Sequence, residues 1–231
     1  DKIFRKMERR YFLISSFLSL GLISQKVYSS TKAPTLGFNV MLNDESVGFS
    51  NLTHKKLKNG LEVVVDVEIK PKFLGLKFMK YTLKNREVWK RQKLISLDAN
   101  SSWFGKKYFA KGQREKGGFR IEGSAFSGVI KDNFATTSYF TPDFLKRKTW
   151  ISTQDGTPLE IETRRLKNKK VTFNDKTYSV KEWEISGDLD LTLQYDENNN
   201  WVGSSFTVGN YPAKFTLNNR KNNIHKIWKT N

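Results

Sequence analysis

The sequence predicts an all-β fold in which a single antiparallel meander of about ten strands curls into a barrel or half-barrel. Three observations lead to this expectation. Apolar residues recur at every second position in several segments, which is the period of a strand with one buried face. Short turn signals separate these segments, and the chain almost lacks the spacing of amphipathic helices. A sandwich of two sheets is the alternative arrangement of the same strands.

The clearest strand is expected between residues 61 and 69. Its residues alternate between Leu61, Val63, Val65, Val67 and Ile69 on one face and Glu62, Asp66 and Glu68 on the other. A second strand is expected where Leu189, Leu191, Leu193 and Tyr195 alternate with Asp188, Asp190, Thr192, Gln194 and Asp196. Both patterns predict strands with one face in the core and one face in water.

Turn-forming residues lie between the expected strands. They are Asn43-Asp44, Asn59-Gly60, Gly117-Gly118, Asn174-Asp175, Gly187-Asp188 and the segment 197–200. Such residues tolerate the backbone angles of tight hairpins. The helical signal is confined to residues 142–147, where Thr141 is a candidate N-cap, Pro142 takes the first position and Asp143 lies in the first turn.

The N-terminal region is typical of a twin-arginine export signal. Arg9 and Arg10 precede Phe12 and Leu13, and residues 11–24 carry no charge. This run is shorter than the roughly 20 apolar residues that cross a bilayer, so it predicts an export signal rather than a spanning helix. We therefore expect a periplasmic protein, either with the signal removed or with an uncleaved signal as a residual membrane anchor.

Three regions are expected: the export signal at 1–30, one β domain at 31–217, and a polar, basic tail at 218–231 that frays. The chain has no cysteine, which excludes disulfides and thiolate metal sites. Stability must therefore come from the core, for which 17 Phe, 8 Tyr and 6 Trp supply large apolar surfaces. We expect a monomer.

The net charge of +18 favours anionic partners such as lipid head groups or an anionic envelope surface. A lysine-rich composition that reflects an AT-rich coding sequence explains the charge equally well. Because the export signal places the protein outside the cytoplasm, we expect no nucleic-acid partner.

The stretch from Lys70 to Lys93 combines cations with apolar and aromatic side chains. We expect it, together with Tyr139 and Phe140, to bind a lipid or another amphiphile, because apolar burial stabilises the tail while lysines meet the anionic group. The expected ligand contacts are Phe73, Leu76, Phe78, Met79, Tyr81, Trp89, Tyr139 and Phe140, and the expected contacts to an anionic group are Lys70, Lys72, Lys77 and Lys80. A strand with one face in the core and lysines in water would have the same composition.

Two further segments are candidates for exposed positions. Trp103 and Phe104 are adjacent, so both rings do not easily face inward from one strand, and we expect one of them at a rim. The other tryptophans are expected in the core. The hydroxyl groups of residues 136–140 are expected either to line the mouth of a cavity or to cap a turn.

Side chains suited to catalysis are sparse. His54 and His225 are the two histidines, both expected in solvent, and neither has a second histidine or a cysteine at ligand spacing. Asp188, Asp190 and Asp196 could supply a carboxylate pair, but the wet face of a strand explains them better. The sequence contains no phosphate-binding glycine loop and no nucleophile motif. We therefore expect no catalytic residues, no metal and no cofactor.

A series of short motifs runs through the expected β domain. They are Phe38-Asn-Val40, Gly48, Glu87-Val-Trp89, Leu94-Ile-Ser-Leu97, Thr137-Ser-Tyr139, Thr153-Gln-Asp-Gly156, Gly187-Asp-Leu189, Tyr195-Asp196 and Trp201-Val202. In this order they resemble an exported bacterial family known as a domain of unknown function, over residues 38–217. The resemblance implies a periplasmic β-protein and no assigned activity. Phe140, where tryptophan is common, and Trp103-Phe104, where a turn rich in Asp and Asn is usual, depart from the pattern.

The sequence thus predicts an exported cell-envelope protein that binds a hydrophobic or amphipathic ligand without catalysis. The alternative is an accessory or structural subunit that docks on an envelope complex, through a protein partner, or on an anionic surface. A carboxylate-dependent hydrolase is the third hypothesis. An apolar cavity would favour the first, a filled core with an exposed aromatic patch the second, and inward carboxylates the third.

Overall fold

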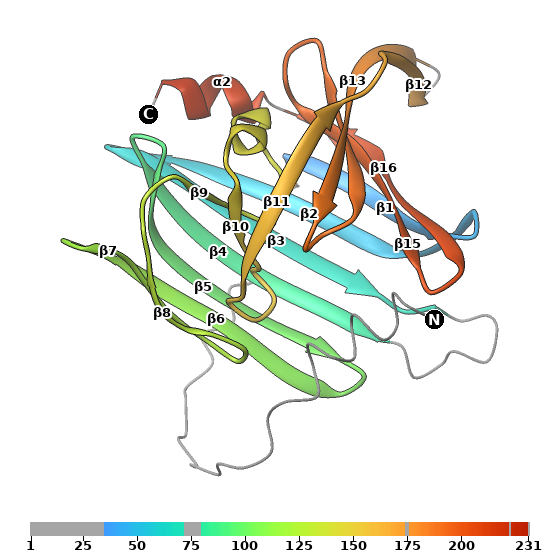
Figure 1. The fold of residues 1–231 in the computed structure, drawn as a ribbon. Coiled ribbons are helices and arrows are strands. Elements are labelled where there is room, and N and C mark those ends of the chain that lie inside the picture. Colours follow the sequence, from blue (N-terminus) through green and yellow to red (C-terminus); the bar gives the residue numbers. More distant parts are fainter. Residues whose placement is uncertain (1–34, 72–79, 174–175, 222, 231) are drawn as a thin grey trace.

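The computed structural model describes residues 35–71, 80–173, 176–221 and 223–230 (Figure 1). Their backbone forms sixteen strands, one short 3-10 helix and one α-helix. The strands are β1 (Leu36–Leu42), β2 (Glu45–Leu57), β3 (Gly60–Ile69), β4 (Tyr81–Lys90), β5 (Lys93–Trp103), β6 (Lys106–Glu115), β7 (Gly118–Gly123), β8 (Ser127–Ile130), β9 (Phe134–Thr136), β10 (Thr149–Ile151), β11 (Pro158–Arg165), β12 (Lys169–Phe173), β13 (Lys176–Gly187), β14 (Leu191–Asp196), β15 (Trp201–Val208) and β16 (Tyr211–Arg220). The helices are η1 (Pro142–Lys146) and α2 (Ile224–Lys229).

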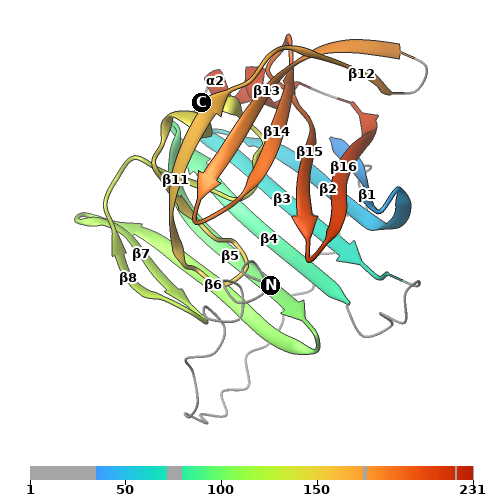
Figure 2. The same cartoon turned by 45° about the vertical axis from the view of Figure 1, so that its right-hand side comes forward.

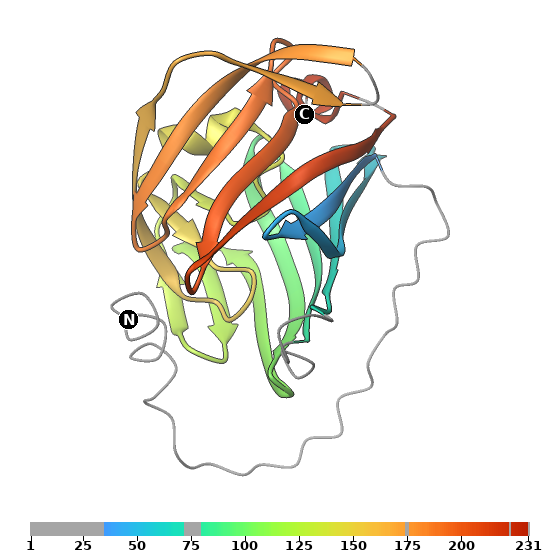
Figure 3. The ribbon, with the colours of Figure 1, turned by 90° about the vertical axis from the view of Figure 1, so that its right-hand side faces the viewer.

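These strands form one sheet, which is antiparallel except where β9 pairs with β10. Its order is β8-β7-β6-β5-β4-β3-β2-β1-β16-β15-β14-β13-β11-β10-β9, and β12 pairs with β13. The sheet curls until it nearly closes into a barrel, with β2 to β8 in one wall and β11 to β16 in the facing wall (Figures 1 and 3). The predicted all-β class and the barrel or half-barrel are confirmed.

The two ends of the sheet are formed by consecutive strands of the chain. β8 ends at Ile130 and β9 begins at Phe134, so residues 131–133 cross from one edge of the sheet to the other. We call this crossing the seam. Because so few residues join the edges, the seam holds the two walls close together.

Tight turns join neighbouring strands. Asn43-Asp44, Arg91-Gln92 and Phe104-Gly105 connect β1 to β2, β4 to β5 and β5 to β6, and both residues of each pair have φ between 47° and 78°. This is the type I′ geometry, whose twist matches the flanking strands. Asn, Asp and Gly adopt it readily, whereas arginine and phenylalanine do so at a cost in free energy.

The expected alternation is confirmed in β3, where Leu61, Val63, Val65 and Val67 are all buried. The expectation for the second alternating segment is wrong at Gln194 and Asp196, which are both buried. The Asp196 carboxylate pairs with Arg220 of β16 and accepts a hydrogen bond from the backbone N–H of Asn200 at 2.9 Å. It closes the turn between β14 and β15 instead of facing water.

An aromatic cluster fills one end of the space between the walls. It consists of Trp89, Phe140, Phe144 and Trp228, whose ring centroids lie 5.0 to 6.1 Å apart. These rings come from β4, from the segment before η1, from η1 and from α2. The interior of the curled sheet is therefore filled at this end by one ring from a wall, Trp89, and by three rings from elements outside the walls.

The predicted helical turn is confirmed as η1. Thr141 caps it, because its hydroxyl accepts a hydrogen bond from the backbone N–H of Asp143 at 3.3 Å. Phe144 and Leu145 are buried, so η1 lies against the core and not on the surface.

The C-terminal residues differ from the expected fraying tail. β16 continues to Arg220, and α2 then packs on the core with Ile224 and Trp228 fully buried. His225 is also buried and shares a hydrogen bond of 2.9 Å with the hydroxyl of Thr141, so its predicted exposure is wrong. Ile224 and Trp228 are four residues apart, which places both on one face of the helix.

We predict that Trp228→Ala lowers the free energy of unfolding by about 3–5 kcal/mol, because it leaves a large cavity among rings that cannot close it. It also removes the hydrogen bond of 2.8 Å that the indole donates to Asp143. Urea unfolding measures the loss. Lys226→Ala, at an exposed position of the same helix, is the matched control and should change stability little. Equal effects of the two variants would contradict the docking of α2.

Candidate ligand-binding cleft

Part of the predicted basic and aromatic site lies outside the described residues. This applies to Phe73, Leu76, Phe78, Met79, Lys72 and Lys77, and to the export-signal residues Arg9, Arg10, Phe12 and Leu13. Among the described members, Lys70 and Lys80 flank Glu68 at 2.6 and 3.9 Å. The Tyr81 ring meets Trp103 edge-on at 5.7 Å.

The other predicted ligand contacts lie in the interior. Trp89 and Phe140 have no exposed surface, and Trp89 is at the opposite end of β4 from Tyr81. Tyr139 lies between Trp150 and Trp201, and burial raises the pKa of its hydroxyl far above the usual value. The structure therefore does not bring Trp89 and Tyr81 together. A direct contact of these rings with a ligand stays a prediction.

A buried carboxyl group was not anticipated from the sequence. Glu87 has no exposed surface; Asn85 Nδ2 donates to its Oε1 at 2.8 Å, and the Trp89 indole donates to its Oε2 at 2.7 Å. Ser138 also donates to Oε2 at 3.2 Å, and the hydroxyls of Ser138 and Thr136 are 2.8 Å apart. The hydroxyl groups of this segment thus serve an interior polar cluster.

Burial raises the pKa of Glu87, and the hydrogen bonds from its neighbours offset this only in part. The Oδ1 atom of Asn85 is buried without a hydrogen-bond partner. The raised pKa of Glu87 favours a neutral carboxyl in the core.

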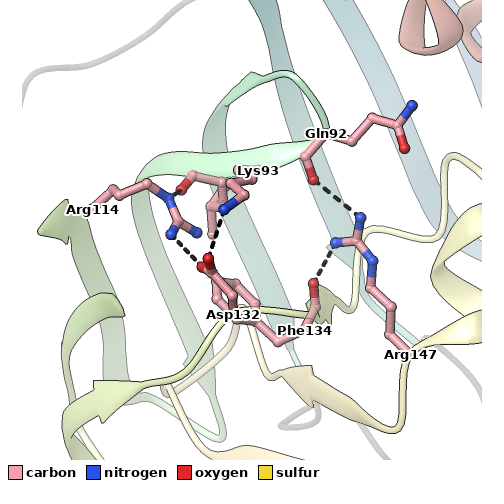
Figure 4. A network of polar contacts seen from close by, with 7 residues as sticks. Gln92, Lys93, Arg114, Asp132, Phe134 and Arg147 are labelled. Atoms are coloured by element: carbon pink, nitrogen blue, oxygen red, sulfur yellow. Dashed lines mark hydrogen bonds and ion pairs between the residues drawn. The ribbon is translucent and has the colours of Figure 1, made fainter. Parts of the chain in front are cut away.

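A cleft of about 290 Å³ lies at the seam (Figure 4). It is lined by Arg91, Gln92, Lys93, Leu94, Arg114, Asp132, Asn133, Phe134 and Arg147. These residues come from the β4–β5 turn, the start of β5, the end of β6, the seam, β9 and the residue that follows η1. The cleft therefore forms only when both edges of the sheet meet.

Asp132, within the seam, is held by cations from the wall beside it. The ammonium group of Lys93 lies 2.7 Å from its Oδ2, and Arg114 binds its Oδ1. Arg114 also donates from Nε to the Leu94 carbonyl at 2.7 Å. Hydrogen bonds from Lys93 and Arg114 lower the pKa of Asp132, so this carboxylate stays charged.

Arg147 closes the other side of the cleft. Its guanidinium donates to the carbonyl oxygens of Phe134 and, at 3.0 Å, of Gln92, as Figure 4 shows. It also lies over the aromatic cluster, 5.4 Å from the centre of the Phe144 ring and 5.9 Å from that of Trp228. This cation is thus fixed mainly by neutral groups; it forms no salt bridge among the described residues, although the carboxylate of Asp143 acts on it at longer range.

The cleft carries an excess of positive charge. Four cations line it, namely Arg91, Lys93, Arg114 and Arg147, against the one carboxylate of Asp132. Leu94 and Phe134 also line it, although both side chains are almost fully buried. Such a site has the chemistry to hold a phosphate or carboxylate group beside a short apolar segment.

Sequence reasoning missed this cleft because its cations are dispersed along the chain. Arg91, Arg114 and Arg147 belong to no common motif, and only the closure of the sheet places them together. Glu87 could have been found, since Leu83 and Trp89 share its phase in β4 and predict that it faces inward.

Among the described residues, no group of three or more histidine, cysteine, aspartate or glutamate side chains could hold a metal ion. The same part of the chain contains no helix long and apolar enough to cross a membrane.

A family model described as a domain of unknown function (DUF6134) matches residues 38–218. This range agrees with the extent of the motifs quoted above. The chain has no match among curated proteins or solved structures.

We predict that Glu87→Gln removes a pH dependence of stability. The folded pKa of Glu87 is raised, so above pH of about 4.5 the unfolded chain loses its proton while the folded chain keeps it. The wild type should therefore lose stability relative to the variant as the pH rises above that value, by about 1.4 kcal/mol per unit until the folded carboxyl ionises.

Urea unfolding at several pH values between 4 and 8 measures this difference. Glu122→Gln, at an exposed position of β7, is the matched control and should show no such trend. A constant difference between wild type and Glu87→Gln over this range would mean that Glu87 is ionised in the core.

Proposed function

Because the chain belongs to the DUF6134 family of domains of unknown function, we propose its function from its own residues: it is a non-catalytic protein of the cell envelope that binds the anionic group of an amphipathic ligand in the cleft at the seam. A lipid is one ligand of this kind.

The excess of positive charge in the cleft carries this proposal. Lys93 and Arg114 share Asp132, but Arg91 is exposed, and among the described residues no carboxylate pairs with it. Arg147 is bound to carbonyl oxygens. An anionic group would therefore meet two cations, Arg91 and Arg147, that form no salt bridge among the described residues, in a partly enclosed place where ion pairing is stronger than in bulk water.

The size and the lining of the cleft support an amphipathic ligand. About 290 Å³ is at the lower end of small-molecule sites, so the cleft suits a head group rather than a whole lipid tail. The aliphatic stems of the arginine and lysine side chains in the lining offer apolar surface to the first carbons that follow the head group. The filled aromatic interior makes the seam a better location for binding than the inside of the barrel.

The place of action is part of the same proposal. The arginine pair Arg9 and Arg10 supports export to the periplasm by the twin-arginine route, where amphiphiles with anionic groups are abundant. We propose a monomer, because the described residues build the whole lining of the cleft from one chain.

An accessory role is the second candidate function. The interior is filled by aromatic rings, and Phe104 at the β5–β6 turn is 49% exposed. A filled core with an exposed aromatic residue favours docking on an envelope complex or an anionic surface. This candidate does not depend on the cleft.

We predict that Arg91→Asn weakens the binding of dodecyl phosphate by about threefold to tenfold, because it removes one charge-assisted contact. Asparagine suits the positive φ of this turn position, so the fold should be unchanged. Titration calorimetry of wild type and variant measures the loss. Added salt should weaken the wild type in the same direction.

Lys131→Asn is the matched control, because it removes one positive charge beside the cleft from a residue that does not line it. Dodecyl maltoside is the neutral probe. Equal binding of both amphiphiles, or equal losses for both variants, would contradict a site at the seam. Native mass spectrometry of protein purified from its own envelope, followed by organic extraction, identifies the natural ligand.

A further inference from the structure

The tip of the β5–β6 hairpin exposes an aromatic side chain in an unfavourable backbone conformation. Phe104 has a φ of 50° and Gly105 a φ of 78°, so the two residues form a type I′ turn. Phe104 is 49% exposed, more than the other exposed large hydrophobic residues of the described chain, Val129 and Tyr211. In Figure 3 this hairpin is the green one whose tip reaches furthest down among the coloured elements.

Stability does not account for phenylalanine at this position. A positive φ at a residue other than glycine, asparagine or aspartate costs free energy, and an exposed ring recovers little of it by burial. The two other type I′ turns described above, between β1 and β2 and between β4 and β5, hold the polar residues Asn43-Asp44 and Arg91-Gln92. Asn-Gly would fit the β5–β6 turn better than Phe104-Gly105 does.

Phe104 does not stand alone on this surface. Its ring lies edge-on against Trp103 at 4.8 Å, and Trp103 lies edge-on against Tyr81 at 5.7 Å. Trp103 and Tyr81 are both partly exposed. The three rings thus form a row from the end of β5 to the start of β4, and we call this row the aromatic tip.

Lysines surround the aromatic tip. Lys106 and Lys107 follow the turn directly and are exposed, and neither has a carboxylate partner among the described residues. Lys80, next to Tyr81, is exposed at the other end of the row and 3.9 Å from Glu68. Aromatic rings with flanking lysines match the interface of a membrane that carries anionic lipids, because the rings enter the head-group layer while lysines meet phosphates.

We propose that the aromatic tip docks the protein on an anionic lipid surface, with Phe104 and Trp103 in the head-group layer and Lys106 and Lys107 on lipid phosphates. This surface is distinct from the cleft. Lys93 and Trp103 are the two ends of β5, so the cleft and the tip lie roughly 33 Å apart along one strand. In Figure 2 the tip of this hairpin is at the lower edge of the sheet, away from β7 and β8.

Phe104→Asn tests the proposal without a cost to the fold. It creates the Asn-Gly pair that type I′ turns prefer, so thermal unfolding should occur at the same or a higher temperature. Co-sedimentation of the full chain with vesicles of phosphatidylcholine and phosphatidylglycerol should show binding about tenfold weaker than wild type, because the apolar contact of one ring is lost. Phe104→Trp should retain binding, since tryptophan suits the interface equally well.

Two controls separate this surface from any other part of the chain. Val129→Thr removes an exposed apolar side chain from β8 and should bind vesicles as the wild type does. Exchange of Lys106 and Lys107 for glutamate should abolish the preference for anionic over purely phosphatidylcholine vesicles. Regions common to all variants contribute equally to each measurement.

Three results would overturn the proposal. The first is equal binding of wild type and Phe104→Asn to anionic vesicles. The second is a wild type that binds neutral and anionic vesicles alike or binds neither. The third is a result in which the capture of another protein requires Phe104 but the binding of vesicles does not. That result would assign the aromatic tip to a protein partner.

Discussion

The fold depends on the closure of the sheet across the seam. The two edge strands, β8 and β9, are consecutive in the chain and separated by residues 131–133. From Ile130 to Phe134 the backbone spans at most about 14 Å, so the edges must approach each other and the sheet must curl. Ion pairs from Lys93 and Arg114 to Asp132 then fix the crossing residues on one wall.

Closure also determines what the interior contains. After the seam, the chain enters the space between the walls as β9, the segment 137–141 and η1. This part of the chain supplies Phe140 and Phe144 to the aromatic cluster. It also supplies Ser138, which donates a hydrogen bond to the buried carboxyl group of Glu87. The barrel is therefore filled by its own chain. In contrast to barrels that hold a ligand inside, we propose that recognition here takes place at the seam and at the rim.

Local patterns predicted the elements that depend on neighbouring residues. The alternation in β3 and the cap at Thr141 follow from residues within a few positions of each other, and both were predicted. The cleft unites Arg91, Arg114 and Arg147 from three separate elements, and no local pattern marks such a site. Helix α2 was missed for another reason: it is short, and a polar, basic composition outweighed the spacing of Ile224 and Trp228.

Sequence analysis missed the buried acidic residues because it assumed that acidic residues in an alternating strand pattern face water. Asp196 and Glu87 both lie in strands, yet both are buried, because their partners come from distant segments such as β16 and the residues after β9. Periodicity reports which face a residue occupies but not which face is dry. The register of the whole sheet decides that.

The side chain of Arg147 contacts two regions of the molecule, the cleft and the C-terminal helix α2. Its guanidinium lines the cleft and also lies over the Trp228 ring of the C-terminal helix. A molecule that draws on this cation in the cleft changes the free energy of helix docking, and by linkage the docked helix changes the affinity of the cleft by the same factor. If the proposed binding in the cleft takes place, helix α2 would influence it through Arg147 without touching the ligand.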